Sequence, residues 1–182
     1  MTESTQKAID RETLIALLVG FAVFLATIEL VIPKPLPFLR LGIANLPILI
    51  ALRSLRFRDL FLLVFIKIMV MGLFSGSLFS YTFLFSIAGG ISSFLVMAGT
   101  AAIIKKRLSL VGISVIGAFT SNCVQLWIAG LLVFGEGAWF IAPPFLVVGT
   151  ISSVLLGLLA ARFIQKSQWV RTHLVMNAEH QQ

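Results

Sequence analysis

Five polar side chains interrupt an otherwise apolar sequence at positions where they could bind a small molecule. Glu29, Lys67, Asn122 and Gln125 lie inside hydrophobic runs, and Asn45 follows the proline-rich break after the first run. Polar groups at membrane depth are costly, and they usually face a cavity or a partner. Carboxylate, ammonium and amide groups at such positions are suited to hydrogen bonding and charge pairing with a polar ligand.

The expected depth of these residues differs. At about 1.5 Å per residue from the cytoplasmic ends, Glu29 and Gln125 lie roughly 22 Å up, Asn122 about 18 Å and Lys67 only about 10 Å. Asn45 is expected beside Glu29 and Gln125 in the outer third. Lys67 has two open interpretations, because it could extend to cytoplasmic headgroups or contact a ligand or ion-pair partner. Asn122 and Gln125 share a helix face and could instead bond between helices.

A loop with three prolines follows Glu29 and carries two cations, Lys34 and Arg40. Proline fixes its own φ angle and restricts the preceding residue, so the stretch IPKPLPFLR is expected to be stiff. We expect these two cations to bind an anionic or strongly polar head of an amphipathic ligand. Some of the surrounding aromatic side chains could supply apolar walls for its aromatic or isoprenoid body: Phe38, Phe83, Phe85 and Trp127.

The sequence offers little for enzyme chemistry. It has two aspartates, Asp10 and Asp59, and its two histidines, His173 and His180, lie near the C-terminus. No catalytic triad, metal-ligand cluster or phosphate-binding G-x-x-x-x-G-K-[ST] loop can be assembled from these residues. We therefore predict no enzyme activity, no metal and no cofactor, and energy for any active transport must come from partner proteins.

Composition identifies an integral membrane protein. The sequence is 59% hydrophobic and 12% charged, with a mean hydropathy of +1.05. Apolar runs of about 20 residues are typical of spanning helices. We predict one all-α membrane domain over 13–165, with cytoplasmic tails at 1–12 and 166–182. The net charge of +7 is expected to orient the chain and contact membrane lipids, not nucleic acid, because the basic residues separate apolar segments.

Six apolar segments are expected: 14–32, 41–52, 60–74, 81–104, 110–134 and 138–164. The second is too short to interpret by hydropathy alone, so charge decides whether it spans. If all six span and both termini are cytoplasmic, 11 of the 14 basic residues lie inside and only Lys34 and Arg40 lie outside. This agrees with the positive-inside rule, so we predict a six-helix, multi-pass protein of the bacterial cytoplasmic membrane.

Small residues recur at four-residue spacing in the first segment, as Ala16-xxx-Gly20 and Ala22-xxx-Ala26. Such spacing lets a second helix approach closely. Two interpretations stay open, which are packing within the bundle and a docking face for a partner.

Several motifs carry a family resemblance across about residues 14 to 165. They are Glu29-x-x-Ile-Pro-x-Pro, Leu41-Gly-Ile-Ala-Asn45, Arg-Phe-Arg-Asp at 56–59, Leu84-Phe-Ser-Ile-Ala-Gly-Gly90, and Ile113-Ser-Val-Ile-Gly-Ala118 followed by Asn122 and Gln125. This pattern resembles the Gx transporter family, also labelled heptaprenyl diphosphate synthase component I. That family is similar to the substrate-binding S components of energy-coupling factor (ECF) transporters.

The resemblance implies a six-helix S component that binds a vitamin-like molecule near the outer face. It also implies a membrane coupling subunit powered by two ATPases, contacted by small residues of the first helix, either Ala22 and Ala26 or Ala16 and Gly20. Prenyl diphosphate synthases hold magnesium with aspartate-rich motifs, which this sequence lacks. The alternative hypothesis is a non-transporting accessory or scaffold subunit of a quinone or electron-transfer system.

Overall fold

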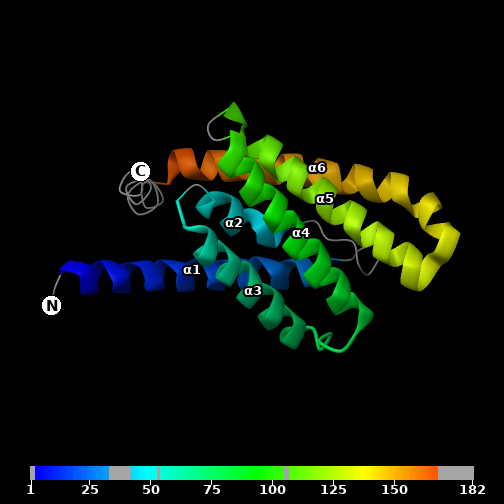
Figure 1. Cartoon of the computed structure of the whole chain (residues 1–182), viewed down its shortest axis with the longest axis horizontal. Helices are drawn as coiled ribbons and strands as arrows, with labels where there is room; N and C mark the ends of the chain where they lie inside the picture. The colour runs from blue at the N-terminus through cyan, green and yellow to red at the C-terminus, as the bar shows by residue number, and fades with distance from the viewer. Residues whose placement is uncertain (1–2, 33–41, 53, 105–106, 168–182) are drawn as a thin grey trace.

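The computed structural model describes residues 3–32, 42–52, 54–104 and 107–167, and these form an all-helical bundle (Figure 1). Five long helices and one short helix carry the fold. In chain order they are α1 (Glu3–Val31), α2 (Leu46–Ala51), α3 (Phe57–Phe74), α4 (Tyr81–Ile104), α5 (Leu110–Ala129) and α6 (Ala138–Lys166). Shorter turns complete it: the 3-10 turn η1 (Ile43–Asn45), the π-helical turn η3 (Gly130–Phe134) and the 3-10 turn η4 (Gly135–Gly137).

Local sequence explains several helix ends. Ser109 caps α5, because its hydroxyl accepts a hydrogen bond from the backbone N–H of Gly112. Pro47 occupies the first turn of α2, where a missing N–H costs nothing. Gly135 has a φ of 53°, a conformation that glycine adopts easily, and it turns the chain between α5 and α6. Both ends of α4 and the start of α6 coincide with the ends of apolar runs in the sequence.

The first helix is longer than predicted. The apolar segment was expected over 14–32, and α1 begins at Glu3, within the predicted polar tail. This stretch contains neither glycine nor proline, so a helix nucleated in the apolar run can extend toward the N-terminus.

The second segment is slightly shorter than the predicted range 41–52. Residues 41–52 were expected to form a spanning helix, but the helical part covers only η1 and α2, nine residues or about 13 Å. All of Pro47, Ile48, Leu49, Ile50 and Ala51 are buried. This short helix is hydrophobic all round because it packs inside the bundle.

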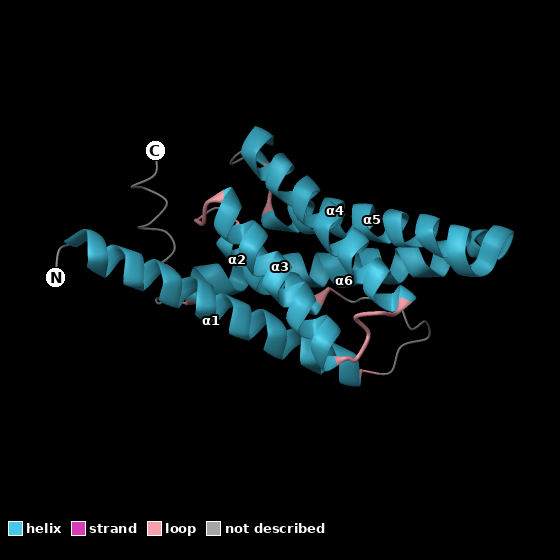
Figure 2. Cartoon of the chain, turned by 60° about the horizontal axis from the view of Figure 1, so that its bottom comes forward, coloured by secondary structure: helices cyan, strands magenta, loops and turns pink. Residues whose placement is uncertain are grey.

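Packing places α2 at the centre of the bundle. It contacts α1, α3 and α6, while the most extensive helix contacts join α5 to α6 and α4 to α5 (Figure 2). The main buried cluster joins residues of α1, α2, α3, α4, α5 and α6, among them Leu18, Ile48, Leu63, Phe94 and Ile113. One core therefore holds all the long helices together.

The helices are those of a membrane protein. Among the described residues, three stretches have the length and hydropathy to cross a membrane: Glu12–Val31, Tyr81–Ile104 and Leu110–Lys166, the last containing the α5–α6 hairpin. Many large apolar side chains also lie exposed on the outside of the bundle, such as Phe24, Leu131, Leu155 and Phe163. A hydrocarbon environment accommodates such a surface, which water would not.

Candidate ligand-binding cavity

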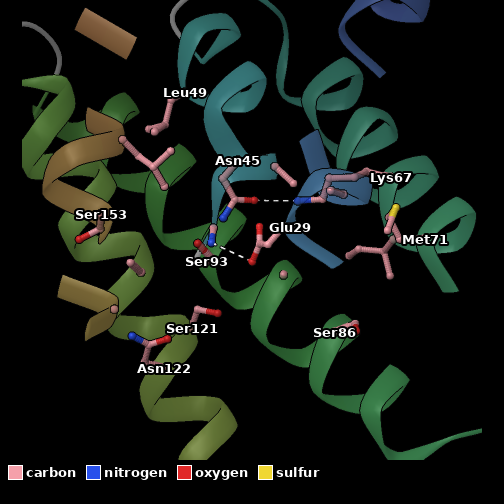
Figure 3. Close-up of a pocket in the computed structure, with 18 of the residues that line it drawn as sticks. Glu29, Asn45, Leu49, Lys67, Met71, Ser86, Ser93, Ser121, Asn122 and Ser153 are labelled. Carbon is pink, nitrogen blue, oxygen red and sulfur yellow. Dashed lines mark hydrogen bonds between the residues drawn. The ribbon is translucent and has the colours of Figure 1, made fainter. Parts of the chain in front are cut away.

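A cavity of about 120 Å³ lies inside the bundle, between the short central helix and the long helices (Figure 3). Residues from α1, η1, α2, α3, α4, α5 and α6 line it. Its polar lining residues are Glu29, Asn45, Lys67, Ser75, Ser77, Ser86, Ser93, Ser114, Ser121, Asn122 and Ser153. A concave site with few convergent polar groups is the usual form of a small-molecule pocket.

Glu29 fastens the start of the second segment to α1. Its side chain is 6% exposed, and Oε1 accepts a hydrogen bond of 3.2 Å from the backbone N–H of Gly42. Gly42 has a φ of 78°, the left-handed conformation that lacks a penalty only in glycine. This conformation lets the chain turn into η1 next to the C-terminal end of α1.

Lys67 of α3 reaches into the same cavity. Its Nζ donates a hydrogen bond of 2.7 Å to Oδ1 of Asn45, and its side chain is 6% exposed (Figure 3). Of the two interpretations of Lys67, the structure supports the inward-facing one and not the extension to headgroups. Although a separation in depth from Glu29 was predicted, the structure brings both residues to the same turn, because Lys67 bonds to Asn45 and Glu29 bonds to Gly42. We call Glu29, Asn45 and Lys67 the charged cluster.

Asn122 lies across the cavity on α5. Its side chain is buried and lines the cavity, and a Cβ added at Gly149 of α6 would overlap its Nδ2. No side-chain hydrogen bond joins Asn122 to any described residue, so the structure does not give it the interhelical bond that was the alternative. Glycine at position 149 leaves the room that the amide occupies.

Gln125 is buried but lies behind the cavity wall. Its Nε2 donates a hydrogen bond of 3.0 Å to Oγ of Ser121, which does line the cavity. Gln125, which was predicted to bind the ligand, therefore does not itself line the cavity.

The serines of α4, α5 and α6 are the part of the site that sequence reasoning missed. Lining residues recur at helical spacing, as Ser86, Gly90 and Ser93 on α4. The same spacing places Ser114 and Ser121 on one face of α5. Small and hydroxyl residues every three or four positions in an apolar helix are the signal that could have identified this wall.

Other predicted site residues fall elsewhere. Lys34, Arg40 and Phe38 lie outside the described residues. Phe83 packs against the main core, Phe85 is fully buried in a second cluster, and Trp127 is exposed. Among the described residues, the cavity is lined by no aromatic side chain, so the expected aromatic walls are replaced by Leu, Ile, Met and Ala side chains.

The two small-residue pairs of α1 differ in exposure. Ala22 is fully buried in the main core and Ala26 lines the cavity, whereas Ala16 and Gly20 are exposed. The expectation that Ala22 and Ala26 would form an open contact face is corrected, because this chain already covers them. Ala16 and Gly20 are the pair on the open side of α1.

Comparison with known protein families identifies the chain. A family model described as heptaprenyl diphosphate synthase component I matches residues 18–163. The match covers most of the chain. Of the long helices it leaves out only the start of α1 and the last residues of α6. The chain belongs to this family, as its motifs indicated. No curated protein and no solved structure matches it.

The family description names a component of a synthase. Among the described residues, no three side chains of His, Cys, Asp or Glu come together as metal ligands. The described lining residues of the cavity include a single carboxylate, that of Glu29. The aspartate-rich magnesium chemistry of prenyl diphosphate synthesis therefore finds no counterpart in this cavity.

Proposed function

We propose that this chain is the substrate-binding subunit of an ECF-type importer, in which it captures a small vitamin-like or quinone- or isoprenoid-related amphipathic molecule at the outer membrane face. Its family membership and its Gx-like motifs support this assignment. The observation that carries it is the cavity, in which buried charged and amide side chains from three separate helices, Glu29 of α1, Lys67 of α3 and Asn122 of α5, converge inside an apolar bundle.

The charge distribution supports an arrangement of six crossings with both termini inside. The starts of α1 and α3, the end of α4, the start of α5 and the end of α6 lie toward the same end of the bundle (Figure 1). Because α1 and α3 run in the same direction, the chain must return between them, and α2 lies on that return. In this arrangement the second crossing is a short helix buried by its neighbours.

Uptake against a gradient requires energy from partners. The sequence has no phosphate-binding loop, so we assign ATP hydrolysis to two separate ATPase subunits and transmission to a membrane coupling subunit. The exposed pair Ala16 and Gly20 would give a coupling helix a close approach on α1.

The proposal is tested by identifying the small molecules that are bound to the purified protein. The full chain is extracted from its own membrane in lipid nanodiscs, and bound small molecules are released and identified by mass spectrometry. We expect one small molecule at a near-stoichiometric amount. Arg40→Gln should retain roughly ten- to a hundredfold less of it if a charged hydrogen bond is lost, and Arg171→Gln in the C-terminal tail should retain as much as the wild type.

Absence of any bound molecule, together with stable capture of a large membrane partner, would contradict the importer assignment. That result would instead support the accessory or scaffold subunit of a quinone or electron-transfer system.

A further inference from the structure

The cavity wall formed by α4 and α5 holds unused hydrogen-bonding capacity. Ser93 is 2% exposed, lines the cavity, and its Oγ has no hydrogen-bond partner among the described residues. A buried polar atom without a partner costs free energy, so such atoms in a native protein require an explanation. A bound ligand would supply the missing partner.

Two α5 side chains extend this capacity. Ser121 accepts a hydrogen bond from Nε2 of Gln125, which leaves its own hydroxyl proton able to donate. Asn122 presents both an amide donor and an amide acceptor at the cavity, and no described side chain bonds to it. We call Ser93, Ser121 and Asn122 the uncharged cluster.

Close helix packing fixes the uncharged cluster in place. A Cβ at Gly117 would lie 3.1 Å from Oγ of Ser93, and one at Gly89 would lie 2.8 Å from Oγ of Ser121. The serines of α4 and α5 therefore sit where glycines of the facing helix let the backbones approach. Side chains held this way lose little conformational freedom on binding, which favours selective recognition.

From this geometry we infer that the uncharged cluster recognises a planar amide-type group of the ligand, such as a carboxamide, lactam or ureide. An amide edge pairs one donor with one acceptor, which matches the Asn122 amide. The second lone pair of the ligand's carbonyl oxygen can accept from Ser121 or Ser93. The inference rests on the proposed function and narrows the substrate to a compact polar molecule.

The same features exclude a long prenyl chain from this part of the cavity. At about 120 Å³ the cavity is smaller than the roughly 300–1,000 Å³ of pockets for drug-sized ligands. Its α4, α5 and α6 walls present serine hydroxyls in place of a continuous hydrocarbon surface. A prenyl chain here would leave the buried Ser93 hydroxyl without a partner.

The test uses probe compounds of defined chemistry on the full chain in nanodiscs. Nicotinamide, 2-pyrrolidone and uracil carry the amide-type group, and geranyl diphosphate carries a prenyl chain and phosphates. We expect at least one amide probe to raise the melting temperature saturably, and geranyl diphosphate to leave it unchanged. In Ser93→Ala and in Asn122→Ala the apparent Kd of that probe should weaken at least tenfold.

Matched variants separate recognition from folding. Ser92→Ala on α4 and Thr120→Ala on α5 remove hydroxyls that bond to their own helix, to Gly89 and Ile116, and should bind the probe like the wild type. Ligand-free Ser93→Ala should melt at or above the wild-type temperature, because it removes an unpartnered polar atom.

Each outcome decides the inference. It is overturned if no amide probe stabilises the wild type, or if geranyl diphosphate stabilises it equally in wild type and Asn122→Ala. A natural ligand that is recovered by mass spectrometry but lacks an amide-type group would overturn it while leaving the importer assignment intact. Failure of the wild type to retain any molecule would contradict the importer assignment itself.

Discussion

At the scale of single residues, the site depends on one glycine whose backbone no other residue adopts easily. Gly42 has a φ of 78° and donates its N–H to Glu29. We expect Gly42→Ala to lower the free energy of unfolding by about 1–2 kcal/mol, because a Cβ disfavours the left-handed conformation. Thermal unfolding in detergent micelles measures the change.

The control for this substitution is Gly20→Ala on α1. A Cβ at Gly20 meets nothing within 4 Å, and the residue lies inside a helix. Alanine there should be neutral or stabilise the helix by up to about 1 kcal/mol. An equal loss of unfolding free energy in both variants would show that the left-handed conformation of Gly42 is not the cause of the loss.

The hydrogen bond between Lys67 and Asn45 makes a second residue-scale prediction. Lys67→Met and Asn45→Ala each remove one partner of a 2.7 Å bond. A charged hydrogen bond contributes about 1.5–3 kcal/mol, so the double variant should lose less unfolding free energy than the sum of the two single variants. If the losses of unfolding free energy in the two single variants add up to that of the double variant, Lys67 and Asn45 do not stabilise each other.

The sequence alone singled out some of the buried polar residues, Glu29, Lys67 and Asn122 among them, but not which residues meet. Glu29, Asn45, Lys67 and Asn122 stand out because polar groups are costly within apolar helices. Their grouping depends on the depth at which η1 re-enters the bundle, and a count of residues along separate helices cannot give that depth. Lys67 was therefore expected well below Glu29, although both line one cavity.

At the scale of helices, glycines set how closely α4, α5 and α6 pack. A Cβ at Gly157 of α6 would lie 2.5 Å from the backbone Cα of Val111 on α5. Because a backbone atom cannot rotate away, Gly157→Ala should force the helices apart and cost about 1–3 kcal/mol of stability. Gly99→Ala on α4, which meets nothing within 4 Å, is the matched control.

Unfolding in detergent micelles measures this difference as well. Equal stability of Gly157→Ala and the wild type would mean that α5 and α6 can separate without cost.

The open face of α1 makes a prediction about partners. Ala16→Trp and Gly20→Trp should leave ligand retention unchanged but reduce capture of a coupling subunit, because bulky residues block close helix contact. Ala22→Trp should instead destabilise the fold, since Ala22 is fully buried. Co-purification with membrane partners and thermal unfolding of the same samples distinguish the two effects.

Helix bounds were predicted best where the length of an apolar run in the sequence alone decides them. The run over 81–104 became α4 with the same ends, and the break at 135–137 became the turn η4. The bounds of the second segment were predicted less well, because a short, largely buried helix has the same apolar composition as part of a spanning one. Its length is set by tertiary packing against α1, α3 and α6, which composition does not record.

At the scale of the whole molecule, the helix directions are compatible with the orientation that the positive-inside rule predicts. The end of α4 and the start of α5 lie at the end of the bundle where α1 begins, and the α5–α6 turn lies at the opposite end (Figure 1). Basic residues lie near the helix ends at the end of the bundle where α1 begins, for example Arg107 before α5 and Lys166 at the end of α6. The turn at 135–137, at the opposite end, carries a single charged residue, Glu136. An excess of basic residues marks the cytoplasmic side.

Cysteine labelling tests this orientation directly. Cys123 is exposed and must first be replaced by serine, after which Glu136→Cys and Arg107→Cys each give a single thiol. A membrane-impermeant maleimide applied to intact cells should label position 136, while position 107 should react only after the membrane is permeabilised. The reverse pattern would place the cavity end of α1 on the cytoplasmic side, and capture of a molecule from outside would then be impossible for this protein.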